Sequence, residues 1–289
     1  MSNAENLRQI LARPEVLILP GCYDAMSARL IEQAGFQSTF MGGFAVAAAR
    51  LGVPDTGLIS YSEMLDQGRN ICSAVNFPVF GDGDTGYGNA VNVQRTVKGY
   101  AQAGFACIMI EDQVAPKKCG HTQGKQVVGR DEAFSRVQAA VDARDALKQS
   151  GGDILIMART DANATDGLEE AILRAKTFAD IGADITFLEA PRNEDEMREY
   201  CSSVRGYKMA NMVEQGSTPV LPPQTLGELG YKIAVYPITL MLAGIQAMEE
   251  TLKALAKGEN PNHLADFAHL RDVVGFPDYY EKEKKYSAD

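Results

Sequence analysis

The chain lacks a long hydrophobic run. Among its 289 residues, the apolar run at 238–248 is too short to cross a bilayer and is interrupted by Gly244 and Gln246. Residues 1–13 carry Glu5 and Arg8 and contain no apolar core of the signal-peptide type. We therefore expect a cytoplasmic protein with no membrane partner.

Paired cysteines and basic clusters are also missing. The five cysteines form no CxxC pattern, which favours reduced thiols over a disulfide framework. The formal net charge is −10 and no Lys/Arg cluster stands out, so nucleic acid is not an expected partner. An acidic protein that binds an anionic substrate needs a local positive centre, such as a metal ion or an arginine.

Short apolar runs alternate with amphipathic stretches of helical length along most of the chain. Near-continuous apolar runs are typical of parallel strands that are buried on both faces. The runs are residues 16–20, 38–42, 78–80, 106–110, 154–158, 185–188, 207–210 and 232–236. The helical patterns are residues 25–34, 91–103, 130–148, 168–181, 194–204 and 222–229. Eight βα units predict an α/β fold of the (β/α)8 TIM barrel type, with a doubly wound open sheet as the alternative.

No linker or low-complexity stretch divides the chain, so we predict a single barrel domain over residues 1–289. A barrel of this type typically takes about 250 residues. Residues 262–289 follow the eighth unit, and we expect them to form a C-terminal helical extension. This extension would dock on the barrel or on a neighbouring subunit.

Polar residues follow most of the predicted strands. Active sites of TIM barrels form at the carboxyl ends of the strands. In chain order, the residues at these ends include Tyr23, Asp24, Gly42, Gly43, Phe44, Asp82, Asp84, Glu111, Asp112, Arg159, Asp161, Glu189 and Asn211. Their recurrence at one end of the predicted barrel indicates a catalytic site there.

The pair Asp82 and Asp84 predicts a metal site. Residues two apart in extended chain point to the same side, and two converging carboxylates repel unless a cation lies between them. Glu111 ends the next strand and would join them, with Asp55 as an outer acceptor. A few oxygen ligands of this kind suit Mg2+, with Mn2+ as an alternative. The competing interpretation is a pair of solvated loop aspartates.

Residues 117–121, Lys-Lys-Cys-Gly-His, form a second candidate group after the fourth strand. Gly120 and Gly124 flank His121, as expected for a mobile loop. Neighbouring cationic groups favour the thiolate form of Cys119, and a tunable thiol on a loop can act as a general acid or base. The alternative is an exposed basic loop with an incidental cysteine.

Arg159 leaves a buried strand and needs an anionic partner. One candidate is a substrate carboxylate held by two hydrogen bonds, and the other is a structural pair with Asp161 or Glu189. We favour the substrate role because this acidic protein is expected to bind a polyanion.

Together these segments resemble the isocitrate lyase/phosphoenolpyruvate mutase superfamily, and within it the group of 2,3-dimethylmalate lyase, petal death protein and methylisocitrate lyase. The resemblance runs from about residue 16 to about residue 255. It is carried by residues 52–55, 82–86, 111–114, 117–121, 158–161, 189–191 and 210–214. The resemblance implies a barrel that is usually a homotetramer, in which partners exchange a C-terminal helix.

The resemblance also implies roles for the candidate residues. Mg2+ would be held directly by Asp82, with Asp84, Glu111 and Asp55 acting through waters. Cys119 would be the catalytic acid of a closing loop, and Arg159 and Glu189 would serve catalysis. The implied substrate-binding residues are Gly42, Gly43, Phe44, Lys117, Gly120, His121, Arg159, Glu189 and Asn211.

The implied reaction is a retro-aldol cleavage of a small 2-hydroxy dicarboxylate. The C2–C3 bond breaks, one product is a 2-oxo acid, and Cys119 protonates the carbanion of the other. Related lyases often have Tyr at the position of Phe40, so the base that removes the hydroxyl proton stays unassigned.

The identity of the substrate follows from the expected distal pocket. Val213 stands where related methylisocitrate lyases carry a hydroxyl, Gly42 replaces a common Ser, and Phe44 offers an apolar wall. These features favour a 2-alkylmalate such as 2,3-dimethylmalate, cleaved to pyruvate and propionate. The alternatives are a 2-methylisocitrate lyase, which yields pyruvate and succinate, a carboxyphosphonoenolpyruvate mutase, an oxaloacetate hydrolase and a non-catalytic metabolite-binding barrel.

Overall fold

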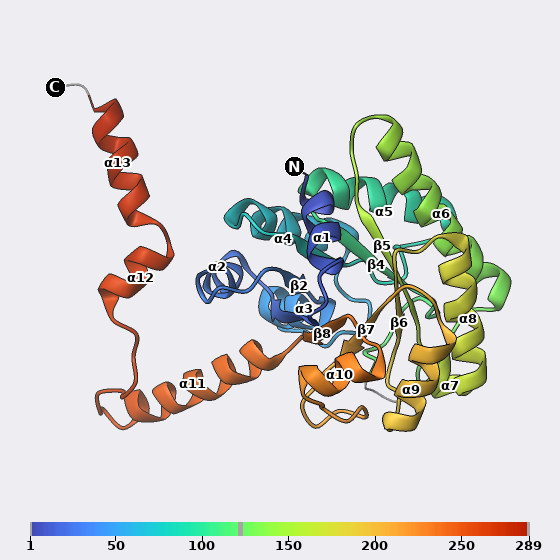
Figure 1. The fold of residues 1–289 in the computed structure, drawn as a ribbon. Helices are drawn as coiled ribbons and strands as arrows, with labels where there is room; N and C mark the ends of the chain where they lie inside the picture. Colours follow the sequence, from blue (N-terminus) through green and yellow to red (C-terminus); the bar gives the residue numbers. More distant parts are fainter. Residues whose placement is uncertain (1, 121–123, 288–289) are drawn as a thin grey trace.

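Eight parallel strands close into a barrel in the order of the sequence (Figure 1). The structure is a computed structural model that describes residues 2–120 and 124–287. The strands are β1 Leu17–Cys22, β2 Thr39–Met41, β3 Val79–Asp82, β4 Cys107–Glu111, β5 Leu155–Thr160, β6 Ile185–Leu188, β7 Tyr207–Asn211 and β8 Ile233–Tyr236. Closure is made by β1 and β8, which pair from Leu17 with Ile233 onward. The predicted TIM barrel is therefore confirmed, and the open-sheet alternative is wrong.

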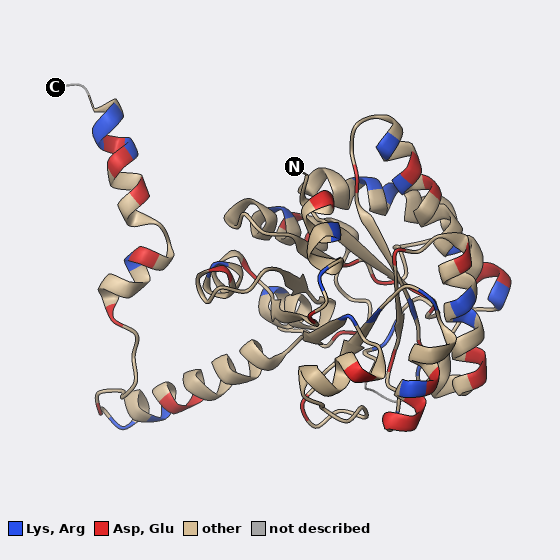
Figure 2. Cartoon of the chain, viewed as in Figure 1, with Lys and Arg blue, Asp and Glu red and all other residues tan. Residues whose placement is uncertain are grey.

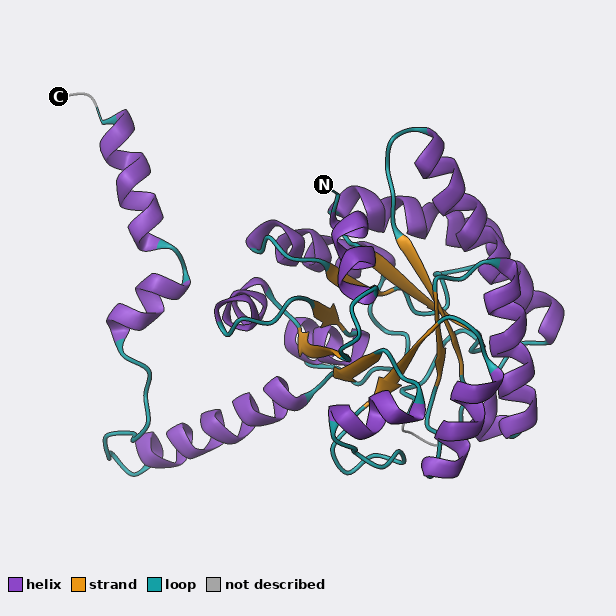
Figure 3. Cartoon of the chain, in the orientation of Figure 1, coloured by secondary structure: helices purple, strands orange, loops and turns teal. Residues whose placement is uncertain are grey.

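Helices cover the outside of the barrel (Figure 3). They are α2 Ala25–Gln33, α3 Gly43–Leu51, α4 Tyr61–Ala74, α5 Ala90–Ala103, α6 Arg130–Gln149, α7 Ala162–Thr165, α8 Leu168–Ile181, α9 Glu194–Ser203 and α10 Pro223–Leu229. The six predicted helical segments are all present, whereas α3, α4 and α7 were not predicted. Acidic and basic residues are interspersed over these outer helices (Figure 2).

A short N-terminal helix, α1 Asn3–Leu11, belongs to the apolar core inside the barrel. Its buried Leu7, Ile10 and Leu11 share one apolar cluster with strand residues such as Leu19 and Leu155. Ser2 begins the helix with a capping box, in which its hydroxyl accepts from the backbone N–H of Glu5. The interior of the barrel is thus a packed core.

The C-terminal helices α11 Thr239–Ala256, α12 Phe267–Val273 and α13 Phe276–Tyr286 form an arm that leaves the barrel (Figure 1). The arm exposes large apolar side chains, among them Leu252 at 62% and Phe267 at 72%. It touches the barrel where Arg29 of α2 donates a hydrogen bond to the Val273 carbonyl at 3.1 Å. In the described part of the chain, no helix is both long and apolar enough to span a bilayer.

Candidate active site

A cavity of about 230 Å³ lies at the carboxyl ends of the strands. Its polar lining residues are Asp55, Asp82, Lys117, Lys118, Cys119, Arg159, Glu189 and Asn211. The other lining residues are Phe40, Gly42, Gly43, Phe44, Met109, Gly120, Phe187, Met209, Val213, Val235, Pro237 and Ile238. Most candidate residues from the sequence therefore meet around one cavity. Asp84 and Glu111 are buried beside it, and His121 lies outside the described residues.

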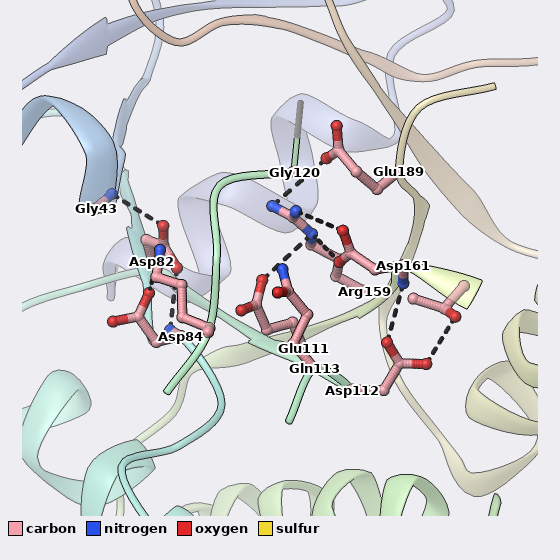
Figure 4. A network of polar contacts seen from close by, with 12 residues as sticks. Gly43, Asp82, Asp84, Glu111, Asp112, Gln113, Gly120, Arg159, Asp161 and Glu189 are labelled. Atoms are coloured by element: carbon pink, nitrogen blue, oxygen red, sulfur yellow. Dashed lines mark hydrogen bonds and ion pairs between the residues drawn. The ribbon is translucent and has the colours of Figure 1, made fainter. Parts of the chain in front are cut away.

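Asp82 is held in place by backbone groups of α3 and of the loop that follows β3 (Figure 4). One carboxylate oxygen accepts from the N–H of Gly43 at 2.9 Å, and the other accepts from the N–H of Asp84 at 3.0 Å. Gly43 is the first residue of α3, where the helix dipole favours a negative charge. The hydroxyl of Tyr100 donates to the Asp82 carbonyl at 2.7 Å. The chain thus presents the Asp82 carboxylate to the cavity in a fixed orientation.

Lys117 joins two of the candidate carboxylates. Its Nζ lies 2.6 Å from Asp55 Oδ1 and 2.8 Å from Asp84 Oδ1. Burial raises the pKa of Asp84 to about 6, although Lys117 counteracts the rise. Asp84 also has a φ of 47°, in the left-handed region that is rare for a residue with a side chain. Lys117 therefore compensates the charge of two buried carboxylates at once.

Glu111 is the third buried carboxylate of the predicted metal site. One oxygen, Oε2, lies 3.3 Å from Arg159 Nε, whereas Oε1 is buried without a hydrogen-bond partner in the described part of the chain. Burial raises the pKa of Glu111 well above its ordinary value, and the nearby Arg159 and Lys117 counteract the rise. An ion or an ordered water would satisfy the unpaired oxygen.

The residues around Asp82 fit a divalent cation in chemistry and charge. Asp55, Asp82, Asp84 and Glu111 are four buried carboxylates, and Lys117 and Arg159 are the cations paired with members of this set among the described residues. Hard oxygen donors of this kind suit Mg2+. In the residues that the structure describes, no three acidic, thiol or imidazole groups converge as a ready metal site. The ammonium of Lys117 instead stands between Asp55 and Asp84. Of these four carboxylates, Asp82 and Asp55 line the cavity and are within reach of a ligand there.

Arg159 forms a structural pair with Asp161, one of the partners that the sequence left open. Its Nε and Nη2 donate to the two oxygens of Asp161 at 2.7 and 3.0 Å, and its Nη1 lies 3.4 Å from Glu189 Oε2. The guanidinium also lines the cavity. Asp161 therefore orients Arg159, and the substrate role of Arg159 stays a prediction.

Glu189 and Asn211 lie side by side at the ends of β6 and β7. Asn211 Nδ2 lies 3.4 and 3.3 Å from the two carboxylate oxygens of Glu189, which is fully buried. Ala190 follows with a φ of 55°, and its carbonyl accepts a hydrogen bond from Asn163 at 3.1 Å. A strained residue of this kind persists only where its surroundings hold it, which is common at functional sites.

The cysteine segment, residues 117–120, is joined by hydrogen bonds to Gln113, which lies two residues beyond the end of β4. Gln113 and Lys118 exchange two hydrogen bonds, with the Gln113 amide donating to the Lys118 carbonyl at 2.9 Å and the Lys118 N–H donating back at 3.0 Å. A Cβ on Gly120 would collide with Arg159 Nη2 and lie 2.8 Å from Glu189 Cδ, so only glycine fits there. Cys119 thus lines the cavity on a segment pressed against Arg159 and Glu189.

Three residues that hold this site were not predicted: Tyr100, Gln113 and Lys125. Lys125 Nζ donates to the Gly120 carbonyl and lies 3.1 Å from Asp161 Oδ1. The contacts of Tyr100 with Asp82 and of Lys125 with Asp161 span 18 and 36 positions, whereas Gln113–Lys118 and Lys125–Gly120 span five. Cys22 lies at the end of β1 but does not belong to the site. It is fully buried, and burial raises the pKa of its thiol to about 12, so it is a core residue.

An acidic, thiol-bearing cavity at the carboxyl ends of a TIM barrel defines an enzyme-type site. A family model described as phosphoenolpyruvate phosphomutase matches residues 7–256. The chain therefore belongs to the phosphoenolpyruvate mutase family, as the resemblance in the sequence implied.

Curated relatives cover almost the whole chain. The chain is 40% identical to the 2,3-dimethylmalate lyase of Eubacterium barkeri, over 99% of both proteins. It is 41% identical to the carboxyvinyl-carboxyphosphonate phosphorylmutase of Arabidopsis thaliana, over 96% of this chain and 83% of that protein. It is 38% identical to the 2-methylisocitrate lyase of Aeropyrum pernix, over 97% and 90%.

Solved structures give the same grouping. An oxaloacetate acetylhydrolase in complex with 3,3-difluorooxalacetate superposes with a TM-score of 0.95 at 32% identity, over 100% of this chain and 98% of that one. A 2,3-dimethylmalate lyase gives 0.93 at 33% identity, over 100% and 96%. A phosphonopyruvate hydrolase in complex with oxalate and Mg2+ gives 0.86 at 27% identity, over 99% of each chain. These lyase, mutase and hydrolase names support an enzyme, and among the predicted classes they support a carbon–carbon lyase.

Proposed function

We propose that the protein is a Mg2+-dependent lyase that cleaves a 2-alkylmalate, with 2,3-dimethylmalate as the reference substrate. The observation that carries this proposal is the lining of the cavity. None of the described lining residues carries a hydroxyl group, whereas Phe40, Phe187 and Val213 contribute apolar surface beside Arg159 and Asp82. Such a cavity suits two carboxylates and alkyl substituents better than a third carboxylate.

Cleavage of 2,3-dimethylmalate yields pyruvate and propionate. The C2–C3 bond breaks, C2 becomes the carbonyl carbon of pyruvate, and the electron pair stays on C3. Cys119 lines the cavity and is the proposed acid that delivers a proton to C3. Overall one proton leaves the 2-hydroxyl and one reaches C3. Arg159 and Asn211 would bind substrate carboxylates, with Glu189 and Asp161 holding Arg159 in place.

Magnesium is the proposed cofactor because the carboxylate set suits it. Asp82 would hold the ion directly, with Asp84, Glu111 and Asp55 acting through waters. When bound, the ion would supply positive charge beside the oxygen atoms of the substrate at C1 and C2. The unpaired Glu111 Oε1 supports this assignment, and so does the related hydrolase structure that contains oxalate and Mg2+.

A second candidate substrate is 2-methylisocitrate, which would yield pyruvate and succinate. Lys118 lines the cavity and has no ion pair in the described part of the chain, so its ammonium is a suitable partner for a third carboxylate. The relative from Aeropyrum pernix carries the name of that lyase. Val213 and Phe40 argue against 2-methylisocitrate as the substrate, because they place apolar surface in the same cavity.

The deciding experiment measures pyruvate release with Mg2+ from 2,3-dimethylmalate and 2-methylisocitrate in parallel. Faster turnover of dimethylmalate, lost on chelation with EDTA, is the expected result. Faster turnover of methylisocitrate would overturn the substrate and keep the lyase. If neither substrate is turned over, oxalate release from oxaloacetate would indicate a hydrolase instead of a lyase. Turnover of a carboxyphosphonate would in the same way indicate a mutase. Inactivity with all four would favour a metabolite-binding barrel.

We also propose that the arm of α11, α12 and α13 is exchanged between copies in a homotetramer. No residue of α11 or α13 is buried in the single chain, and both helices expose large apolar side chains. Exposed apolar surface of this extent is typical of a protein interface. The family resemblance implies the same assembly.

A further inference from the structure

We infer that Lys125 is a positioning residue that fixes the Cys119–Gly120 peptide against the active-site cavity. The inference rests on the proposed role of Cys119 as the acid. Lys125 lies five residues beyond Gly120, yet its side chain is only 5% exposed. Its Nζ donates to the Gly120 carbonyl and lies 3.1 Å from Asp161 Oδ1.

The place of Lys125 in the charge network is specific. Burying an ammonium is costly unless an anion and further acceptors compensate for the lost water. Asp161 supplies the anion and is itself fully buried, so this is no solvent-exposed ion pair. Burial raises the pKa of Asp161, but the effects of Arg159 and Lys125 outweigh it and leave this pKa below its ordinary value. Asp161 is therefore an anion that serves two cations at once.

A hydrogen bond to Asp112 holds the backbone of Asp161 in place (Figure 4). The Asp161 N–H donates to Asp112 Oδ1 at 2.9 Å, and the hydroxyl of Thr160 donates to Asp112 Oδ2 at 2.7 Å. Arg174 of α8 pairs with the same Asp112 at 3.0 Å. Lys125 thus connects the cysteine segment to a rigid anchor at the end of β5, and through Asp161 to the guanidinium of Arg159.

The opposite side of the Gly120 peptide is filled. There is no room for a Cβ on Gly120 between the backbone and Arg159 Nη2 or Glu189. Gly120 is therefore held from its carbonyl by Lys125 and packed against Arg159 and Glu189. Because Cys119 is bonded directly to Gly120 and lines the cavity, Lys125 sets the position of the thiol without touching the substrate.

The test compares Lys125→Met with Lys176→Met, which removes an exposed lysine on α8. A displaced catalytic group loses on the order of 100-fold in rate for a shift of about 1 Å, so kcat of Lys125→Met should fall at least about tenfold while KM changes little. Lys125→Arg, which keeps the cation, should recover part of kcat. Lys176→Met should match the wild type.

A second readout is independent of turnover. Alkylation of Cys119 by iodoacetamide, followed by peptide mass spectrometry, reports the position and shielding of the thiol. With Mg2+ and oxalate as the probe, the wild type should be protected, and Lys125→Met should lose protection while its circular dichroism spectrum stays native. A merely structural lysine would lower the unfolding temperature and leave protection unchanged.

The inference is overturned if Lys125→Met keeps the wild-type kcat or the wild-type protection of Cys119. If Lys125→Met does not fold, Lys125→Arg and Lys125→Gln take its place, and wild-type behaviour of both overturns the inference equally. If wild-type protein turns over neither lyase substrate, the proposed function fails, and the alkylation result alone decides the role of Lys125.

Discussion

Lys117 and Asp55 form a buried ion pair, with Nζ 2.6 Å from Oδ1 and both side chains 6% exposed. The same ammonium lies 2.8 Å from Asp84, so one lysine of the cysteine segment compensates two carboxylates of the proposed metal site. Any cation that enters beside Asp82 shares these carboxylates with Lys117. Binding of the proposed metal and the position of the cysteine segment would therefore be coupled through this one side chain.

The first prediction concerns Lys117→Met. Removing one partner of a buried pair leaves an uncompensated charge, so the free energy of unfolding should fall by about 3–5 kcal/mol in the presence of a chelator. Mg2+ should then stabilise the variant more than it stabilises the wild type. Urea unfolding with EDTA and with Mg2+ measures both effects. Lys118→Met is the control because Lys118 is exposed. Equal stabilisation by Mg2+ in variant and wild type would contradict the coupling.

A second prediction concerns Gly120→Ala. The added Cβ would meet Arg159 Nη2 and Glu189, so the segment must shift away from the cavity. We expect kcat/KM to fall by at least about tenfold, because a misplaced catalytic group loses rate steeply with distance. Gly129→Ala is the matched control, since a Cβ there meets no atom within 4 Å. Full activity of Gly120→Ala would show that this contact does not constrain the reaction.

The barrel itself could be predicted from the sequence with good accuracy. Parallel strands that are buried on both faces appear in the sequence as short apolar runs. The observed strand ends differ from the predicted ends by at most two residues. Helices α3 and α4 were missed, although the buried residues of α4, Met64, Gly68 and Ile71, recur at helical spacing. Strand ends also gave most of the candidate site, because closure of the barrel brings them together.

The residues that hold the site side chains in position could not be predicted from strand ends. Lys125 reaches Asp161 across 36 positions, and Tyr100 reaches the Asp82 carbonyl across 18. Arg159 shows the same difficulty, because the sequence offered Asp161 and a substrate as competing partners. In the structure, the hydrogen bonds with Asp161 hold the Arg159 guanidinium in the orientation in which it lines the cavity.

Cys119→Ser tests the proposed acid. A hydroxyl is a far weaker proton donor than a thiol, so pyruvate release from the best substrate should fall by about 100-fold or more. The circular dichroism spectrum and stabilisation by Mg2+ should stay as in the wild type. Cys72→Ser is the control, since Cys72 lies outside the cavity. Rates near the wild type would remove Cys119 from the mechanism.

The assembly is tested by placing charge on the arm. Leu252 and Leu255 of α11 are 62% and 56% exposed in the single chain, so replacing both by Asp should not disturb the barrel. If partners cover these residues, the double variant should dissociate, because buried unpaired carboxylates are costly. Analytical ultracentrifugation measures the change, and Glu249→Gln on the same helix is the control. An unchanged sedimentation coefficient would exclude α11 from the interface.

Val213→Ser addresses the choice between substrates. Val213 lines the cavity, and the family resemblance places a hydroxyl at this position in methylisocitrate lyases. A hydroxyl there would donate a hydrogen bond to the additional carboxylate of 2-methylisocitrate and would weaken contact with an alkyl group. One such polar or methyl-sized difference changes discrimination by about 10- to 200-fold. The ratio of kcat/KM for methylisocitrate over dimethylmalate should therefore rise at least about tenfold, whereas Val213→Ala should lower both values without reversing the preference. If Ser and Ala act alike, the hydroxyl has no role in selection, and the preference must come from other lining residues such as Phe40 and Phe44.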